Sequence, residues 1–382
     1  MRFLSGVLVF FLLSSCVGRV VTPIIEEENA VIEDPLRVRA QEIASSLDNR
    51  LLVSQVFISG IDADKSLTAK MIDLFTAIPA GGIMLFRYNL NTDNDTIKAH
   101  LADFNKLIKN ESNLSPFIAV DHEGGGVNRF MRGVADLPAA STYYENISQG
   151  RAETLAAIEA DSLKAGRQIN NLGFTMNFAP VAEYLFDGNR DFLSKRSYGP
   201  DPFFTAQAAE AFIRGMEQAG VLCVVKHFPA SAGPDPHRSP SVLNMDKASL
   251  DNLVSPFASL INKGARAIMA AHTLAPAIDD KIASLSPVIM RNWLRGELGF
   301  NGIIISDDFI MAAAGNTSPE EAAVLSIAAG SDMILIWPAN LPKTYEAFIA
   351  ALEDGRLPRG RLQDAAQKII YEKLRMGLIN GE

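Results

Sequence analysis

Cysteine is nearly absent from this chain of 382 residues, which contains only Cys16 and Cys223. Two cysteines permit at most one disulfide, so the fold cannot depend on a disulfide framework. Cys223 lies within an apolar run, where a thiol usually behaves as a small buried hydrophobic side chain. Cys16 is the more informative of the two, because it directly follows the apolar start of the chain.

An excess of basic residues is also lacking. The chain has 35 Lys and Arg against 44 Asp and Glu, its formal net charge is −9, and no stretch concentrates Lys and Arg. Nonspecific nucleic-acid binding requires a basic surface that displaces counterions from phosphates. We therefore expect no nucleic-acid partner.

A hydrophobic run long enough to cross a bilayer is missing as well. The apolar segment Phe3–Leu13 follows the positive charge of Arg2 and is shorter than the roughly 20 residues of a transmembrane helix. Two serines then precede Cys16, and small residues directly before a cysteine resemble a bacterial lipobox, where the thiol is lipidated and the preceding peptide is removed. An ordinary signal peptide and an apolar N-terminal strand are the alternatives.

The lipobox predicts three parts of the chain. We expect residues 1–15 to be a lipoprotein signal peptide, residues 16–40 an acidic tether and residues 41–382 a single folded domain. A lipid on Cys16 would anchor the domain to a bacterial membrane in the cell envelope, on the periplasmic or extracellular side. We expect the anchored protein to be a monomer.

Short β-type runs alternate with longer helical patterns from about Leu51 onward. In helical windows such as Ala152–Leu172 and Leu362–Leu374, apolar residues recur at the spacing of one helix face. The strand candidates are mostly continuous apolar runs, as expected for parallel strands covered on both faces. Eight such units fit a closed (β/α)8 barrel in one domain better than a doubly wound sheet. The candidates are Leu51–Ser59, Gly82–Phe86, Phe117–Val120, Thr175–Phe178, Val221–Val225, Ala267–Ala271, Gly302–Ile305 and Met333–Ile336.

Charged and polar residues gather where the predicted strands end. Asp121 follows the third strand, Lys226 and His227 follow the fifth, His272 ends the sixth, and Asp307 follows the seventh. The carboxyl ends of barrel strands open into one mouth, where barrel enzymes place their active sites. Each residue alone has a structural explanation, such as a helix cap for Asp307 or a buried polar role for His272. Their convergence favours a functional site.

Four motifs resemble those of glycoside hydrolase family 3, in order and spacing. They are AVDHEGGGVNRF at 119–130, KRSYGPDP at 195–202, KHFP at 226–229 and ISDDF at 305–309. The resemblance runs from about Leu51 to Leu378 and is strongest to the single-domain β-N-acetylglucosaminidases. It implies a retaining hydrolase that removes β-linked N-acetylglucosamine from peptidoglycan-type or chitin-type oligosaccharides, with no cofactor and no metal.

The resemblance also implies a role for individual residues. Asp307 is expected to be the nucleophile that forms a covalent glycosyl-enzyme. His237 is expected to be the acid/base, with Asp235 orienting its ring, because Asp235-Pro236-His237 fits the Asp-x-His of this branch. A turn with an exposed histidine is the alternative for that segment. The residues expected to grip the sugar hydroxyls are Asp121, Arg129, Arg196, Lys226 and His227.

Two departures from the family pattern bear on activity. Ala230-Ser231-Ala232-Gly233 stands where the family has Gly-His-Gly, and the loop is shorter, which affects the positioning of His237. Gly126 stands where the family has an arginine, which affects the barrel mouth or an outer subsite.

Three other functions remain open. A metal-dependent hydrolase would use the histidines near the strand ends, although the first predicted strand carries none. A Schiff-base aldolase would use Lys226 as its amine but leaves Asp307 unexplained. A non-catalytic sugar-binding lipoprotein would fit the altered loop before His237.

Overall fold

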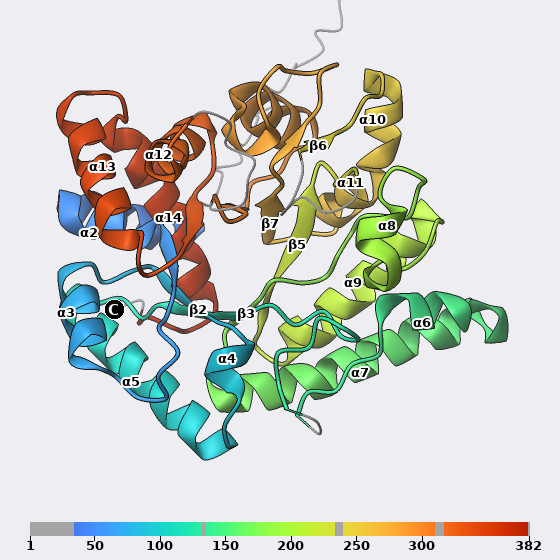
Figure 1. The fold of residues 1–382 in the computed structure, drawn as a ribbon, viewed down its shortest axis with the longest axis horizontal. Coiled ribbons are helices and arrows are strands. Elements are labelled where there is room, and N and C mark those ends of the chain that lie inside the picture. Colours follow the sequence, from blue (N-terminus) through green and yellow to red (C-terminus); the bar gives the residue numbers. More distant parts are fainter. Residues whose placement is uncertain (1–33, 132–133, 234–239, 310–316, 381–382) are drawn as a thin grey trace, which may run out of the picture. The chain divides into compact units, whose positions relative to one another are not determined.

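The structure is a computed structural model that describes residues 34–131, 134–233, 240–309 and 317–380. The chain from Pro35 onward forms one compact unit (Figure 1). The predicted signal peptide, Cys16 and most of the predicted tether lie outside the described residues. Among those that are described, no helix combines the length and the apolar character needed to span a bilayer.

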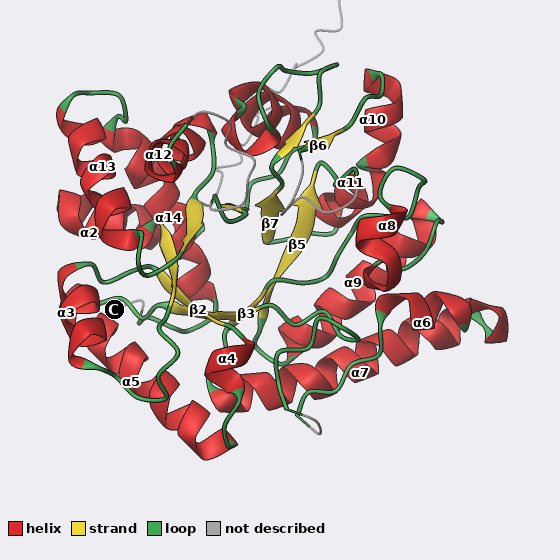
Figure 2. Cartoon of the chain, viewed as in Figure 1, coloured by secondary structure: helices red, strands yellow, loops and turns green. Residues whose placement is uncertain are grey.

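Eight parallel strands close into a barrel at the centre of this unit (Figure 2). The barrel closes where the first strand pairs with the last, with Ile58 opposite Leu335. The predicted (β/α)8 barrel is therefore confirmed. In the order around the barrel, the strands are β1 (Phe57–Gly60), β10 (Met333–Ile336), β9 (Ile303–Ser306), β7 (Ala267–Ala270), β5 (Leu222–Phe228), β4 (Met176–Asn177), β3 (Phe117–Val120) and β2 (Gly82–Leu85).

The strands are buried along their whole length, which explains their continuous apolar sequences. Every residue of β2, β3, β7 and β10 is buried, because side chains pack inside the barrel on one face and against helices on the other. Outside the barrel, α7 (Arg151–Leu172) packs against α9 (Pro202–Gln218) (Figure 1). Helix α1 (Pro35–Ser46) likewise packs against α14 (Arg359–Arg375).

The helices cover the outside of the barrel, and several begin at a capping residue. The side chains of Asp48, Thr68, Asp93, Asp201, Asp246 and Ser318 each accept a backbone N–H of the following first turn. The helices are α1 (Pro35–Ser46), α2 (Asn49–Gln55), α3 (Ala69–Ala77), α4 (Arg87–Leu90), α5 (Asn94–Ser112), α6 (Ala140–Glu145), α7 (Arg151–Leu172), α8 (Arg190–Leu193), α9 (Pro202–Gln218), α10 (Lys247–Leu253), α11 (Ser255–Asn262), α12 (Pro319–Ala329), α13 (Leu341–Glu353) and α14 (Arg359–Arg375).

Shorter elements lie in the connections. A π-helix spans Val288–Glu297, and short 3-10 turns occur at Ile147–Gln149, Ser194–Arg196 and Ala283–Leu285. Two short parallel strands, β6 (Ser241–Val242) and β8 (Thr273–Leu274), pair outside the barrel. This small sheet joins the loop after β5 to the loop after β7.

The first predicted strand was too long at its start. Leu51–Ser59 was expected to be one strand, but α2 occupies its first half and β1 begins at Phe57. Asp48 caps the helix, because its side chain accepts the backbone N–H of Leu51 at 2.8 Å. A short apolar run fits a buried helix as well as a buried strand, so the sequence pattern does not separate the two.

The fifth strand extends further than predicted. It was expected at Val221–Val225, but β5 continues to Phe228 and thus includes Lys226 and His227. These are two adjacent polar residues in an otherwise apolar strand. Both are nevertheless buried, and they lie in the barrel mouth.

Candidate active site

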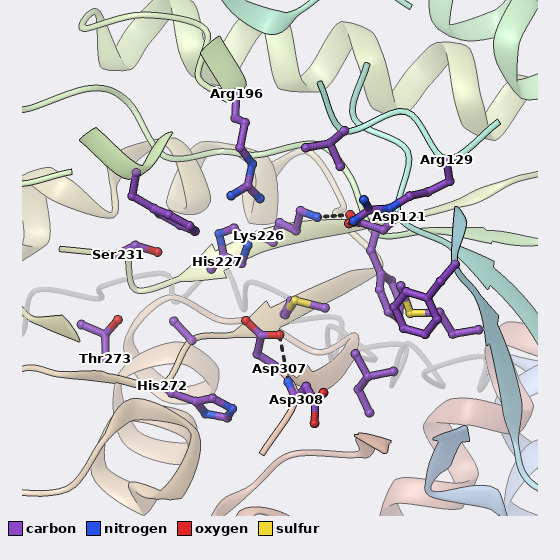
Figure 3. Close-up of a pocket in the computed structure, with 18 of the residues that line it drawn as sticks. Asp121, Arg129, Arg196, Lys226, His227, Ser231, His272, Thr273, Asp307 and Asp308 are labelled. Atoms are coloured by element: carbon purple, nitrogen blue, oxygen red, sulfur yellow. Dashed lines mark hydrogen bonds and ion pairs between the residues drawn. The ribbon is translucent and has the colours of Figure 1, made fainter. Parts of the chain in front are cut away.

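A cavity of about 360 Å³ lies at the carboxyl ends of the barrel strands. Side chains on or directly after β2, β3, β4, β5, β7, β9 and β10 line it (Figure 3). This is where a (β/α)8 barrel presents the residues of its active site. The predicted site residues that the structure describes all line this cavity: Asp121, Arg129, Arg196, Lys226, His227 and Asp307.

Ion pairs hold the cationic side chains of the cavity in place. The Nζ of Lys226 contacts Oδ1 of Asp121 at 2.5 Å and Oε1 of Glu123 at 2.6 Å. Arg129 donates to Oδ2 of Asp121 at 2.5 Å, and Arg196 donates two hydrogen bonds to Glu123 at 2.8 and 2.7 Å. The donors that remain on these cations can grip a polar ligand without rearrangement.

Glu123 is a site residue that the sequence analysis did not single out. Its side chain is 5% exposed, and burial alone would raise its pKa, but Lys226 and Arg196 hold the pKa of this carboxyl far below its usual value. Glu123 in turn raises the pKa of Arg196, against the opposing effect of burial. The glutamate therefore stays ionised and orients both cations. Its position within the DHEGGG sequence after β3 was the available signal.

Asp307 lies directly after β9. Its backbone N–H donates to the carbonyl of Ala270 on the neighbouring β7 at 3.1 Å, and its Oδ1 accepts the backbone N–H of Asp308 at 2.8 Å. Enclosure acts to raise its pKa, but His272, His227 and Lys226 together lower the pKa of Asp307 below the usual carboxyl value. The group is therefore an ionised carboxylate at neutral pH, which is the form that can attack an electrophilic carbon.

An aromatic wall closes the side of the cavity near Asp308. The indole N–H of Trp337 donates to the carboxylate of Asp308. The same indole stacks on Phe86, with ring centroids 4.7 Å apart and an interplanar angle of 11°, and Phe86 stacks in turn on Tyr88. Trp337 follows β10 and was not predicted as a site residue, because a single tryptophan after an apolar strand carries no specific pattern.

Histidines were the basis of the metal-enzyme alternative, and two of them have structural contacts. The Nε2 of His122 lies 2.7 Å from the carbonyl oxygen of Ala135, and burial lowers the pKa of His122 to about 4. His272 lines the cavity, with its Nδ1 2.7 Å from Oγ of Ser284. Within the described ranges, no group of three His, Cys, Asp or Glu side chains is arranged to hold a metal ion.

The predicted acid/base pair lies outside the described residues. Asp235 and His237 fall in the segment 234–239, between Gly233 and Pro240. Ser231 and Thr273 both line the cavity. The Oγ of Ser241, which follows Pro240, accepts hydrogen bonds from the backbone N–H of Ala232 and the hydroxyl of Thr273. The described residues on either side of 234–239 are therefore bonded to each other beside the cavity.

The chain resembles known proteins over most of its length. Residues 53–371 match the family described as "Glycosyl hydrolase family 3 N terminal domain". A β-hexosaminidase of Methylococcus capsulatus is 34% identical over 284 residues, which cover 72% of this chain and 80% of the relative.

Two solved structures share the fold over more than four fifths of this chain. A family 3 β-N-acetylglucosaminidase from Paenibacillus sp. superimposes with a TM-score of 0.81 and 29% identity, over 87% of this chain and 63% of that chain. The NagZ protein of Neisseria gonorrhoeae, solved in complex with N-trifluoroacetyl-D-glucosamine, gives a TM-score of 0.68 and 27% identity, over 85% of this chain and 95% of that chain.

Proposed function

Because this chain belongs to glycoside hydrolase family 3, we propose that this β-N-acetylhexosaminidase removes β-linked N-acetylglucosamine from peptidoglycan-type or chitin-type oligosaccharides by a double displacement. The observation that carries the proposal is the position of Asp307. An ionised carboxylate lies in a cavity that Lys226, Arg196 and Arg129 also line, and ion pairs hold these cations in place. A retaining glycosidase requires a nucleophilic carboxylate below the sugar and polar groups that fix the ring.

In the first step, a carboxylate oxygen of Asp307 forms a bond to the anomeric carbon as the bond to the leaving oxygen breaks. His237 donates a proton to that oxygen, and Asp235 stabilises the ring of His237. In the second step, His237 takes a proton from water, the water oxygen bonds to the anomeric carbon, and Asp307 is released. The sugar leaves with its original β configuration.

The gripping residues supply the fixed donors for this reaction. Arg129, Arg196 and Lys226 line the cavity, and their ion pairs with Asp121 and Glu123 hold them in place. Preorganised donors of this kind need no rearrangement when the sugar binds.

The test is the release of nitrophenol from a β-N-acetylglucosaminide, with and without EDTA. We expect turnover that EDTA does not change, and we expect Asp307→Ala to lower kcat by about ten-thousandfold or more. Asp354→Ala serves as the control and should keep full activity. Asp354 is an exposed acid that pairs with Arg356 and is not among the residues that line the cavity. A near-normal rate for Asp307→Ala would contradict the proposal, as would binding without turnover.

His237 is tested by the leaving group. With a poor leaving group, His237→Ala should lose about a hundredfold or more in kcat, since protonation of the leaving oxygen is lost. An activated nitrophenyl substrate should restore much of the first step. Equal losses on both substrates would contradict the acid role. A fluorinated mechanism-based β-N-acetylglucosaminide should label Asp307, and a label on another residue would reassign the nucleophile.

We further propose that Cys16 carries a lipid that anchors the enzyme in the bacterial cell envelope. The support is the order of residues at the start of the chain, where an apolar run ends in two serines directly before the cysteine. An envelope location would bring the enzyme to cell-wall sugars, which is why peptidoglycan fragments are the first substrate to test.

A further inference from the structure

Glu183 is a buried carboxylate beside the cavity that the mechanism above does not use. The residue is 1% exposed. Its Oε1 lies 2.5 Å from the ring Nδ1 of His227 and accepts the backbone N–H of the same residue at 3.2 Å. Its Oε2 accepts the backbone N–H of Ser231 at 2.5 Å. One carboxylate therefore binds two residues that line the cavity, His227 and Ser231.

The chain after β4 determines where this carboxylate lies. Val181 forms a parallel bridge with Lys226, the backbone N–H of Ala182 donates to the Lys226 carbonyl at 2.8 Å, and Lys226 donates back to the carbonyl of Pro180 at 3.0 Å. These bonds extend the pairing of β4 and β5 up to the residue before His227. They place Glu183 directly next to the His227 ring.

The contact determines which ring nitrogen of His227 carries a proton. Both oxygens of Glu183 accept backbone N–H groups, so we treat this side chain as an acceptor and assign the proton of the 2.5 Å contact to Nδ1 of His227. The other nitrogen, Nε2, is then the polar atom of the ring that is available to the cavity that His227 lines. Without Glu183, an imidazole exchanges between two tautomers and can rotate.

A carboxylate without exposure is unfavourable unless its oxygens are well bonded. If this position only had to be filled, a hydrocarbon side chain would stabilise the fold at least as well. Glu183 instead meets two backbone N–H groups and the imidazole N–H, all from residues in or beside the cavity. All of these contacts of Glu183 are therefore with residues that line the cavity.

We propose that Glu183 is a positioning residue that holds His227 as the Nδ1-protonated tautomer with Nε2 facing the bound sugar, and that ties Ser231 to the same point. The inference deepens the proposed function and rests on it. For histidines that bind a metal, loss of the carboxylate that holds the ring lowers affinity or activity by about 10- to 100-fold, and we expect a loss of the same order here.

The direct test is the state of the His227 ring. The chain contains five histidines, so 15N long-range NMR spectra can resolve each ring, and His227→Gln identifies the His227 signals. We expect the Nδ1-protonated pattern in the wild-type protein. In Glu183→Gln this pattern should be lost or mixed, because a neutral amide can present either a donor or an acceptor. A wild-type His227 protonated at Nε2 alone would overturn the proposal.

Kinetics provide the second readout. Glu183→Gln should lower kcat/KM for the β-N-acetylglucosaminide by about 10- to 100-fold, and Glu183→Asp should restore part of the loss by restoring the charge. The matched control is Glu372→Gln, which removes another buried glutamate, on α14, that pairs with Arg266. The control should lower the melting temperature without changing kcat/KM or the His227 signals.

The two failures can be told apart. If the wild-type enzyme turns over and Glu183→Gln keeps kcat/KM within twofold, the positioning role of Glu183 is wrong and the glycosidase function stands. If the wild-type enzyme does not turn over, the proposed function fails. The 15N NMR spectra of His227 then still test the role of Glu183, because they do not depend on activity.

Discussion

The charges of the site depend on their neighbours more than on their own residue types. Glu123 would resist ionisation in a buried position, yet Lys226 and Arg196 lower its pKa. Asp307 is likewise kept ionised by the histidines and the lysine around it. A nucleophile with a lowered pKa stays charged over the whole neutral range, and its companions stay available as donors.

Two glycines after β3, Gly124 and Gly126, differ in whether the local backbone at the mouth of the barrel requires glycine. Gly124 has a φ of +95°, and a Cβ there would lie 2.3 Å from the carbonyl oxygen of Pro138. The turn it forms lets the backbone N–H of Val127 bond to the Gly124 carbonyl at 3.1 Å. At Gly126, by contrast, a Cβ would meet nothing within 4 Å, and the backbone needs no positive φ.

We therefore predict opposite outcomes for two alanine substitutions. Gly124→Ala should lower the free energy of unfolding by about 2 kcal/mol or more, since both the backbone and the neighbouring carbonyl must shift. Gly126→Ala should change it by less than about 0.5 kcal/mol. Urea denaturation of the two variants measures both values. Equal effects would show that the turn does not require glycine at 124. A Cβ at position 126 would meet no atom within 4 Å, so a clash of the Cβ does not explain why glycine replaces the family's arginine there.

At the scale of an element, α14 carries a lysine that the barrel buries completely. Lys373 is 0% exposed, its Nζ donates to Oε1 of Gln55 at 2.8 Å, and it lies 5.3 Å from the centre of the Phe117 ring. Burial lowers the pKa of Lys373 to about 7. The amine therefore gives up its proton in the folded protein at a pH where the unfolded chain keeps it.

This lysine should make stability rise with pH. Below about pH 7 the amine is charged in both states, so burial of the charge destabilises the folded protein fully. Between about pH 7 and the usual lysine value, the unfolded chain binds the additional proton, and the free energy of unfolding should rise by up to about 1.4 kcal/mol per pH unit. Above that range, the contribution of the lysine is constant.

Comparison of Lys373→Met with the wild-type protein isolates this effect. Urea denaturation at several values from pH 6 to 10 should show a rise that is smaller in the variant. Lys368→Met on the same helix is the control, since Lys368 pairs with Asp364 and is not fully buried. A variant with the same pH slope as the wild-type protein would mean that Lys373 stays charged when folded.

At the scale of the whole molecule, the compact unit begins at Pro35, and helix α1 packs against α14 at the end of the chain. The barrel is thus complete without the residues before α1. If Cys16 is lipidated, the anchor and the enzyme are separable parts, and loss of the lipid should leave catalysis unchanged.

This separation is testable with the two cysteines of the chain. In cells, Cys16→Ala should move the protein from the membrane fraction to the soluble fraction, while kcat for the β-N-acetylglucosaminide stays within about twofold of wild type. Cys223→Ala is the control, because Cys223 is buried within β5 and should not affect fractionation. A Cys16→Ala protein that remains in the membrane would contradict the lipid anchor.

Much of the architecture was predictable because the signals are local. Apolar runs, most of them continuous, located the barrel strands, since a buried parallel strand is apolar on both faces. The misassigned part, 51–55, failed for the same reason, because burial alone does not distinguish a short helix from a strand. The extension of β5 through Lys226 and His227 was missed, because ion pairs with residues far along the chain make burial of these polar groups tolerable.

The sequence by itself determined the (β/α)8 barrel, because the barrel follows from periodicity and from the order of strands along the chain. The family motifs indicated six residues that line the mouth: Asp121, Arg129, Arg196, Lys226, His227 and Asp307. Only the tertiary structure decided how those residues are paired. Lys226 and Asp121 are 105 positions apart, and Glu183 and His227 are 44 apart. These contacts form because the barrel closes and brings the strand ends together. The number of residues between two side chains does not predict the distance between them in the fold.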